Sequence, residues 1–246
     1  MIKFFRKIRY DLMGKNKTGK YLKYAVGEIV LVVIGILIAL SINNWNEERK
    51  TKADEIKILT NIKKALASDI ENQFEFHLER TQTGIENLER IQDYIINRRP
   101  YNDSLNNHFR VLSIAGRITW TPQLTAYKRL ESKGIEIIKK DELLEAILNI
   151  YNLDYPRILL TFDNYKRNIY EYGRPFARRK FKSSGIEDGD GLIPLNYELL
   201  FEDVEFHNTI KVLLGNSRTT QGRLTEIRGN LEHVIKMIDE ELQQYN

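Results

Sequence analysis

The run of nineteen residues from Tyr24 to Ile42 constrains this chain more than any other feature. It reads YAVGEIVLVVIGILIALSI, and Glu28 is its only charged side chain. At about 1.5 Å per residue, a helix of this length measures roughly 28 Å, close to the thickness of the hydrocarbon core of a bilayer. The apolar residues run around all sides of this helix, so the run is not the buried face of a soluble helix. The sequence therefore predicts one transmembrane helix, residues 24–42.

Two aromatic residues bracket this run. Tyr24 and Trp45 are 21 residues apart, a helical distance of roughly 31 Å, which suits one aromatic ring at each membrane interface. Asn43, Asn44 and Asn46 then mark an abrupt return to water. We therefore interpret Tyr24 and Trp45 as membrane-interface anchors.

A retained signal-anchor and a cleaved signal peptide both fit such a run. Ala39, Leu40 and Ser41 follow the small-x-small pattern of a cleavage site. The apolar stretch is nevertheless longer than the hydrophobic region of a typical signal peptide, and the 23-residue lead is long for its basic region. Retention is the favoured interpretation.

The charge distribution predicts the orientation. Residues 1–42 contain eight Lys or Arg and two acids, whereas residues 43–246 contain 30 basic and 32 acidic residues. The positive-inside rule then places the N-terminus in the cytoplasm and the larger domain, residues 43–246, outside, in the periplasm of a bacterial inner membrane. Within the lead, residues 1–23, Ile2, Phe5, Ile8 and Leu12 recur at helical spacing among cations. This pattern predicts a basic amphipathic helix on anionic lipid.

Two features inside the span point beyond simple anchoring. Gly27, Gly35 and Ala39 form a small-residue face through which membrane helices approach closely, although glycine and alanine are common in such helices. Glu28 is an intramembrane acid, a kind of residue that often has a function. It also lies one turn from the cytoplasmic boundary, where it is tolerated as an interfacial charge.

Composition excludes several classes of function. The domain beyond the anchor is nearly neutral, so it lacks the positive field that nucleic-acid binding requires. The chain has no cysteine, which rules out disulfides, thiolate nucleophiles and cysteine-ligated metals. No Walker A loop, G-x-S-x-G elbow or dinucleotide fingerprint occurs.

Helical periodicity dominates the domain after the anchor, and we expect an all-α fold. One long helix is predicted from Glu47 to about Arg98, where Arg99-Pro100 stops it, with Gly84 a candidate bend. Its apolar stripe is Ile56, Leu59, Ile62, Leu66, Ile70, Phe74, Leu78, Ile85, Leu88 and Ile95; the C-terminal stripe is Leu213, Leu224, Ile227, Leu231, Val234, Ile238 and Leu242. These stripes predict an antiparallel, coiled-coil-like pair of first and last helices in a helical bundle, or else a coiled-coil dimer.

Shorter helices are predicted between these two. Thr121-Pro122 is the expected start of one helix, Asp141 the cap of the next, Tyr155-Pro156 the start of a third, and Asp203 the cap of the segment leading into the last. Ile135–Ile138 is the one short strand candidate.

Two blocks of sequence resemble an uncharacterised family of single-pass membrane proteins, a domain of unknown function abundant in Bacteroidetes. The first block is Lys20–Lys23 followed by Tyr24–Leu40 and Asn43–Glu47; the second is Ala126–Gly134 with Leu143, Leu144 and Ile147. The resemblance implies a membrane anchor and carries no catalytic residues over.

Three local patterns are weak site candidates. Arg174, Arg178, Arg179, Lys180 and Lys182 form the densest basic patch outside the anchor, which suits either an anionic partner or a solvated helix face. Residues 187–191 have an Asp/Gly pattern like that of a calcium loop, but the carboxylates at both ends of such a loop are missing, so a plain turn is favoured. Glu-Phe-His occurs at residues 75–77 and again at 205–207, and these groups would converge only if the two helices bring them together.

We therefore expect no catalytic, metal or cofactor site and no enzymatic activity. The leading hypothesis is a protein-interaction or scaffold module, with membrane lipid and either a partner protein or a second copy as its binding partners. The alternative is a ligand-sensing ectodomain that works with a separate membrane partner, since helical bundles on one anchor are common sensory architectures.

Topology is directly testable. Alkaline phosphatase fused after Asn246 is expected to be active, because the positive-inside rule exports the C-terminal domain. A green fluorescent protein fusion at the same position is expected to be dark. The reverse pair of results would place the domain in the cytoplasm and contradict the predicted orientation.

Overall fold

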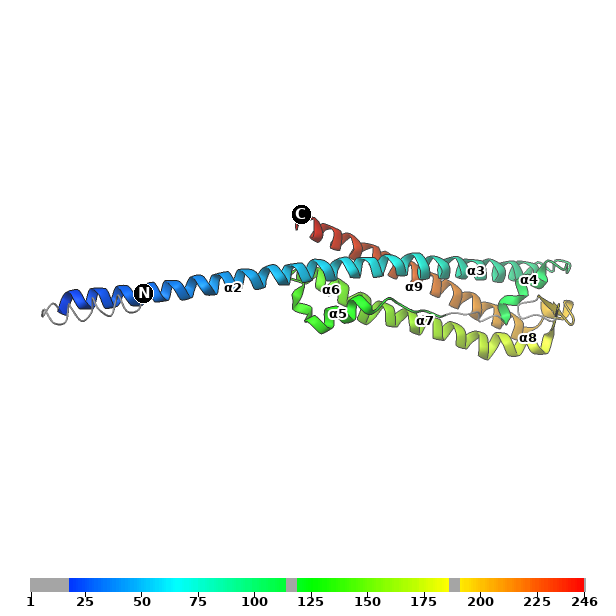
Figure 1. Ribbon diagram of the computed structural model, residues 1–246. Coiled ribbons are helices and arrows are strands. Elements are labelled where there is room, and N and C mark those ends of the chain that lie inside the picture. Colours follow the sequence, from blue (N-terminus) through cyan, green and yellow to red (C-terminus); the bar gives the residue numbers. More distant parts are fainter. Residues whose placement is uncertain (1–17, 114–118, 186–190, 246) are drawn as a thin grey trace. The chain divides into compact units, whose positions relative to one another are not determined.

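The computed structural model describes residues 18–113, 119–185 and 191–245. It divides into two compact units, Met1–Glu55 and Ile56–Asn246. Figure 1 shows the ribbon with its element labels. The expected amphipathic helix in residues 1–17 and the Asp/Gly turn at residues 187–191, except for Gly191, lie outside the described residues.

The first unit consists of the N-terminal part of helix α2, Thr18–Asp69. The apolar side chains between Val26 and Ile42 are exposed in the single chain, Leu31 to 64% and Ile38 to 56%. Within the described part of the chain, this is the one helix long and apolar enough to cross a membrane. The predicted long apolar N-terminal helix is therefore confirmed.

In the second unit, the C-terminal part of α2 continues through a π-helical turn, Ile70–Phe74, into α3, Glu75–Ile96. Arg98 adopts a left-handed conformation with φ 48°, and the helix ends just before it. The predicted helical run to about Arg98 is confirmed. The irregularity lies in the π turn rather than at the expected bend, Gly84, which is an interior residue of α3.

The middle of the chain forms short helices followed by a longer helical run. The short elements are α4 (Leu105–Phe109), a 3-10 turn (Arg110–Leu112), α5 (Thr125–Lys133) and a second 3-10 turn (Ile135–Ile137). The longer run contains α6 (Asp141–Asn149), a π turn (Ile150–Asp154), α7 (Tyr155–Asn168), another π turn (Ile169–Gly173) and α8 (Arg174–Lys180). A hairpin of β1 (Phe181–Ser183) and β2 (Leu192–Pro194), a 3-10 turn (Glu198–Phe201) and α9 (Val204–Gln243) complete the fold.

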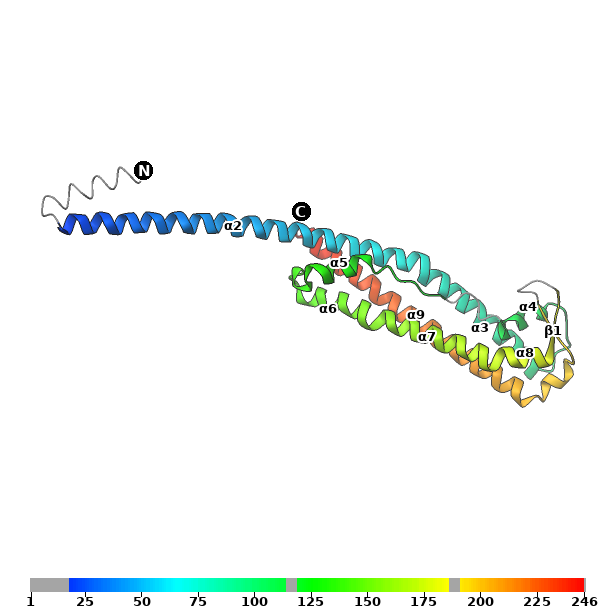
Figure 2. The ribbon, with the colours of Figure 1, turned by 60° about the horizontal axis from the view of Figure 1, so that its bottom comes forward.

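Helix α9 runs antiparallel to α3 and the adjoining part of α2. Lys63 pairs with Asp239, Arg218 with Glu89 at 2.7 Å, and Gln221 with Gln82, so numbering rises along one helix as it falls along the other. Helix α9 contacts both α3 and α7, and Figure 2 shows it crossing α7 in projection. The predicted all-α bundle with antiparallel first and last helices is confirmed, and the pairing occurs within one chain.

The core of the second unit follows one face of α9. Its buried positions alternate in steps of four and three: Phe206, Ile210, Leu213, Ser217, Thr220, Leu224, Ile227, Leu231, Val234, Ile238 and Glu241. This spacing is typical of knobs-into-holes packing. The apolar residues on both sides of Ser217 and Thr220 belong to two separate clusters, one centred on Leu66 and Leu231 and the other on Leu88 and Phe206.

Two of the predicted local features are wrong. Ile135–Ile137 forms a 3-10 turn, and the strands lie instead at Phe181–Ser183 and Leu192–Pro194, with Phe181 opposite Pro194. Helix α5 begins at Thr125 rather than at Thr121-Pro122, because the Gln123 N–H is held by Asp69 on another helix.

The predicted start of a helix at Tyr155-Pro156 is confirmed, because α7 begins at Tyr155, although a π turn joins it to α6 without a break. A proline inside an α-helix removes one hydrogen bond and clashes with the preceding turn. Here a π turn ends two residues before Pro156, and another ends two residues before Pro175. These π turns are wider than α-helical turns and so leave room for each proline ring. The helical run from α6 to α8 therefore continues without a break.

Two of the predicted helix caps can be compared directly with the structure. Asp203 is the N-cap of α9, and its carboxylate accepts a hydrogen bond from the Phe206 N–H at 3.0 Å, as predicted. Asp141 is the first residue of α6 rather than its cap, which is Lys140. An acid in the first turn still interacts favourably with the helix dipole.

Gly173 marks a close approach between two segments. A Cβ atom at this position would lie 2.3 Å from the carbonyl oxygen of Leu112. The contact is with backbone, which cannot rotate away as a flexible side chain would. Glycine at this position therefore allows the end of the third π turn to pack against the segment after α4.

This contact predicts opposite effects for two glycine substitutions. Gly173→Ala is expected to lower the free energy of unfolding by about 1–3 kcal/mol through overpacking. Gly84→Ala, whose Cβ would meet only the Tyr165 hydroxyl at an ordinary 3.8 Å, is expected to raise it by about 0.5–1 kcal/mol. Urea unfolding of the full chain in dodecyl maltoside, followed by Trp120 fluorescence, measures both. Equal stability of the two variants would contradict the close contact.

Candidate functional site

The anchor residues of the first unit are open to their surroundings. A Cβ added at Gly27 or Gly35 would meet nothing within 4 Å, and Ala39 is exposed. Trp45 is exposed to 63%, with the Arg49 guanidinium 5.5 Å from its ring centroid.

Glu28 and Tyr24 are the other two residues predicted in the span. Both lie in α2, and Glu28 is half-buried. Their roles as intramembrane acid and interface anchor stay predictions.

The basic patch is largely neutralised within the domain. The Arg174 Nε donates a hydrogen bond to the Ser113 carbonyl at 2.7 Å, and its guanidinium lies 4.4 Å from the Tyr170 ring. Arg179 pairs with Glu205, and Lys180 pairs with Asp203 at 2.9 Å. Arg178 and Lys182 are exposed. Phe176 and Phe181, which alternate with these cations, are buried, so the segment has the form of a solvated helix face with its aromatic residues turned inward.

The pair formed by Lys180 and Asp203 stabilises the start of α9. Burial alone would raise the pKa of Asp203, but hydrogen bonds from the Lys180 ammonium and the Phe206 N–H outweigh it, and the pKa lies below its ordinary value. The carboxylate therefore stays charged, which favours the N-terminus of a helix.

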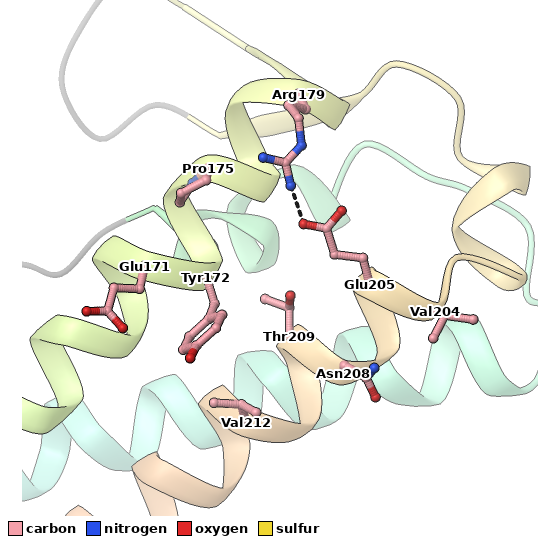
Figure 3. A pocket seen from close by; sticks show the side chains of 9 residues that line it. All are labelled: Glu171, Tyr172, Pro175, Arg179, Val204, Glu205, Asn208, Thr209 and Val212. Atoms are coloured by element: carbon pink, nitrogen blue, oxygen red, sulfur yellow. Dashed lines mark hydrogen bonds and ion pairs between the residues drawn. The ribbon is translucent and has the colours of Figure 1, made fainter.

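A groove of about 550 Å³ lies between α8 and α9. Figure 3 shows Tyr172 and Val212 facing the space between the helices, with the pair of Arg179 and Glu205 at one end. The remaining lining residues are Glu171, Pro175, Val204, Asn208 and Thr209. Because its one cation is already paired with an acid, this groove offers apolar contact rather than a charged binding site.

A buried acid occupies the other end of the bundle. Asp69 is 1% exposed and is the last residue before the first π turn. Its carboxylate accepts hydrogen bonds from the Tyr155 hydroxyl at 2.6 Å and from the Gln123 N–H at 3.1 and 3.2 Å. Burial raises the pKa of Asp69, and these two hydrogen bonds reduce the rise.

Aromatic rings surround this acid. The Trp120 ring centroid lies 4.7 Å from that of Phe74 and 5.8 Å from that of Tyr155. The Tyr127 and Tyr151 rings stack at 4.3 Å. The Tyr151 hydroxyl is buried without a hydrogen-bond partner in the described part of the chain. The cluster fixes residues 119–124 against α2 and α3 and excludes water from Asp69.

Sequence reasoning missed Asp69, although one signal was present. The residue lies seven positions after Ile62 and three after Leu66, on the inward face of the stripe. An acid at such a position needs internal hydrogen-bond partners, because burying a charge alone is costly. Which groups supply them could not be read from the spacing.

The two Glu-Phe-His segments are not brought together. Arg228 of α9 lies 3.9 Å from Glu75, whereas Glu205 pairs with Arg179. The His77 Nε2 lies 3.2 Å from the Thr119 carbonyl oxygen, and the His207 Nε2 lies 2.9 Å from that of Phe201. Over residues 18–113, 119–185 and 191–245, no group of three His, Asp or Glu residues is arranged to hold a metal ion.

Three glycines line the outer face of α9. Gly215, Gly222 and Gly229 are spaced by seven residues, which places them along one side of the helix. All three are exposed, and a Cβ added to any of them would meet nothing within 4 Å. Each costs about 0.5–1 kcal/mol of helix stability relative to alanine. No contact within the single chain explains this row.

Residues 28–217 match a family described as a family of unknown function, DUF6090. The chain belongs to DUF6090. The resemblance to a domain of unknown function is thereby confirmed. Comparison with curated proteins and with solved structures gives no match. The DUF6090 match includes Asp69, Gln123 and Tyr155, so the buried acid and both of its donors lie inside the family's domain.

The raised pKa of Asp69 predicts a particular pH dependence. A carboxyl whose pKa is higher in the folded state stabilises that state fully below its ordinary pKa of 3.8, and this stabilisation is lost as the pH rises through the folded value. The free energy of unfolding of the wild type minus that of Asp69→Asn should therefore fall between pH 3.8 and neutrality. Urea unfolding across this range measures the difference.

The matched control is Asp163→Asn, which changes an exposed aspartate on α7. It makes the same aspartate-to-asparagine change at the surface, where Asp163 pairs with Lys166 at 3.1 Å, and is expected to change the free energy of unfolding by less than about 1 kcal/mol, as for an exposed ion pair. If the difference in free energy of unfolding between the wild type and Asp69→Asn stays flat or rises with pH, burial is not the dominant influence on the pKa of Asp69.

Proposed function

We propose that this chain is a membrane-anchored protein-interaction or scaffold module of the bacterial inner membrane. Residues 24–42 form the anchor, the N-terminus lies in the cytoplasm, and the helical domain lies in the periplasm. The cation-rich lead supports this orientation. Within the DUF6090 domain, the carboxylates of Asp69 and Asp203 and the groups that donate hydrogen bonds to them are engaged in fixing the fold.

The observation that carries this proposal is the row of Gly215, Gly222 and Gly229. A glycine-lined helix face lets the backbone of a second helix approach more closely than any larger side chain would allow. On this face, Thr219 is also exposed and small, and its hydroxyl donates to the Gly215 carbonyl oxygen at 3.0 Å. The outer face of α9 is thus a shallow strip along which another helix packs.

The partner helix belongs to a second copy of the chain or to another protein on the same side of the membrane. Anchoring confines the chain to two dimensions, which raises the effective concentration of such partners. In the anchor itself, Gly27, Gly35 and Ala39 offer an exposed small-residue face for the same kind of packing.

Site-specific photo-crosslinking tests the proposal. Because the chain has no cysteine, Thr219→Cys labelled with benzophenone-maleimide reports on this face alone. Irradiation of membranes containing the full chain is expected to give a discrete crosslinked species. A product of twice the 29.0 kDa chain mass identifies a second copy. Adding Gly222→Leu should reduce the product at least about tenfold, since small-to-large changes disrupt close helix packing.

Two measurements separate loss of binding from loss of fold. Gly222→Leu is expected to keep or raise the melting temperature of the domain, because the new side chain meets nothing within 4 Å in the single chain. Glu145→Cys, at an exposed position on α6, carries the same label and is expected to give no discrete product. Equal crosslinking from both positions, or no effect of Gly222→Leu, would refute an interface on α9.

A further inference from the structure

A second concave site lies between α3, α4 and α7, and none of its described lining residues belongs to α9. It has a volume of about 440 Å³. Its walls are Phe76, Glu79, Arg80, Thr83, Gly84 and Asn87 of α3, Asn107, Arg110 and Val111 of the segment after Pro100, and Tyr165 of α7. We refer to this site as the arginine pocket. Its size falls within the range of small-molecule sites.

Two guanidinium groups line this pocket without acidic partners. Neither Arg80 nor Arg110 forms an ion pair or donates a hydrogen bond to any residue that the structure describes. Both side chains are half-buried, and the Arg110 Nε is fully shielded from solvent with no acceptor in the described residues. Shielding a charged donor without an acceptor is costly. A bound oxyanion would remove this cost.

The neighbouring groups leave the positive charge available. Among the lining residues that the structure describes, Glu79 is the only acid, and it lies on the exposed side of α3. Arg80 lies close enough to His77 to lower the pKa of that imidazole further, in addition to the larger effect of burial. His108 also has a lowered pKa, through burial and the charge of Arg90. Both imidazoles are therefore neutral at pH 7.

Polar and apolar walls complete the pocket. The Asn87 Oδ1 is 2.7 Å from the His108 Nδ1, which donates to it in the neutral ring. The amide N–H groups of Asn87 have no acceptor among the described residues. Phe76 is exposed to 51% and supplies an aromatic surface beside these donors.

The basic patch at Arg174–Lys182 lacks this combination. Its arginines at 174 and 179 and its lysine at 180 are satisfied by Ser113, Glu205 and Asp203. A charge that is already paired gains little from a ligand, whereas an unpaired and partly desolvated guanidinium gains a strong bidentate contact.

We propose that the arginine pocket binds a small organic oxyanion, a carboxylate or phosphate monoester that carries one aromatic or short aliphatic group. Arg80 and Arg110 hold the oxyanion, the Asn87 amide donates a further hydrogen bond, and Phe76 contacts the apolar group. This site is separate from the outer face of α9 and does not depend on the association proposed above.

Isothermal titration of the full chain in dodecyl maltoside, a detergent without phosphate or carboxylate, tests the site. The probes are phenyl phosphate, benzoate and inorganic phosphate. An aromatic anion is expected to bind more tightly than inorganic phosphate, because Phe76 adds apolar contact. Arg80→Gln and Arg110→Gln should each weaken binding about 10- to 100-fold, the usual effect of losing a charge-assisted hydrogen bond. Arg178→Gln, which removes an exposed arginine of α8, should leave affinity within about twofold, as expected for a distant surface charge.

Two further substitutions keep the test valid if an arginine variant misfolds. Thr83→Glu places a carboxylate on the exposed side of α3 beside the pocket and is expected to abolish binding with both arginines intact. Glu79→Gln removes an acid from the pocket wall and should tighten binding about three- to tenfold, since a like charge is removed near the ligand. One of these variants is expected to weaken binding and the other to tighten it, although both lie on the same face of α3. A general loss of stability cannot produce such opposite changes in affinity.

Short-chain phosphatidic acid, titrated in a separate arm, distinguishes a lipid headgroup from a soluble phosphate ester. Preference for either source supports an oxyanion site and identifies where its ligand comes from. Absence of heat with every probe at millimolar concentration would overturn the proposal. Equal weakening by Arg178→Gln and Arg110→Gln would also overturn it, because binding would then follow total charge rather than the pocket.

Discussion

The packing of α9 against α3 and α7 is the interaction on which the rest of the second unit depends. Its inward positions from Phe206 to Glu241 repeat in steps of four and three, so nearly every turn places a side chain in the interior. Each fully buried leucine, isoleucine or phenylalanine contributes about 1.5–3 kcal/mol. Long helices without this shared seam would be marginal in water. The short helices, the hairpin and both pockets are arranged around it.

The spacing of apolar residues predicted the long helices of the fold. The apolar run at residues 24–42 and the stripes through Leu66 and Leu231 depend on residue type and spacing, and the structure has the helices that they predict. The π turns, the hairpin and the start of α5 depend on contacts between distant segments. The Gln123 N–H meets Asp69 across more than fifty residues of chain, and no local pattern encodes that contact.

The candidate sites show the same division between local pattern and tertiary contact. A dense cluster of cations is visible in the sequence at Arg174–Lys182, but the fold supplies Glu205, Asp203 and Ser113 to satisfy three of them. Arg80 and Arg110 are unremarkable in sequence and thirty residues apart. They become noteworthy only because α3 and the turn after α4 bring them into one concave wall, where neither arginine has an ion-pair partner among the described residues. Charge density along a chain is therefore a poorer guide to binding than charge left unpaired by folding.

The π turn at Ile70–Phe74 sets the angular phase of the first long helix. Each π turn holds one residue more than an α-helical turn, and one residue corresponds to about 100° of rotation. Asp69 and Phe74 are both buried and lie five residues apart across this turn, whereas an α-helix spaces positions on one face by three or four. The turn therefore absorbs one extra residue while Leu66 and Leu88 on either side both stay in the core. A single-residue deletion inside the turn would leave a regular α-helix with this facing, whereas the same deletion in the middle of α3 would rotate one half of the helix by about 100°.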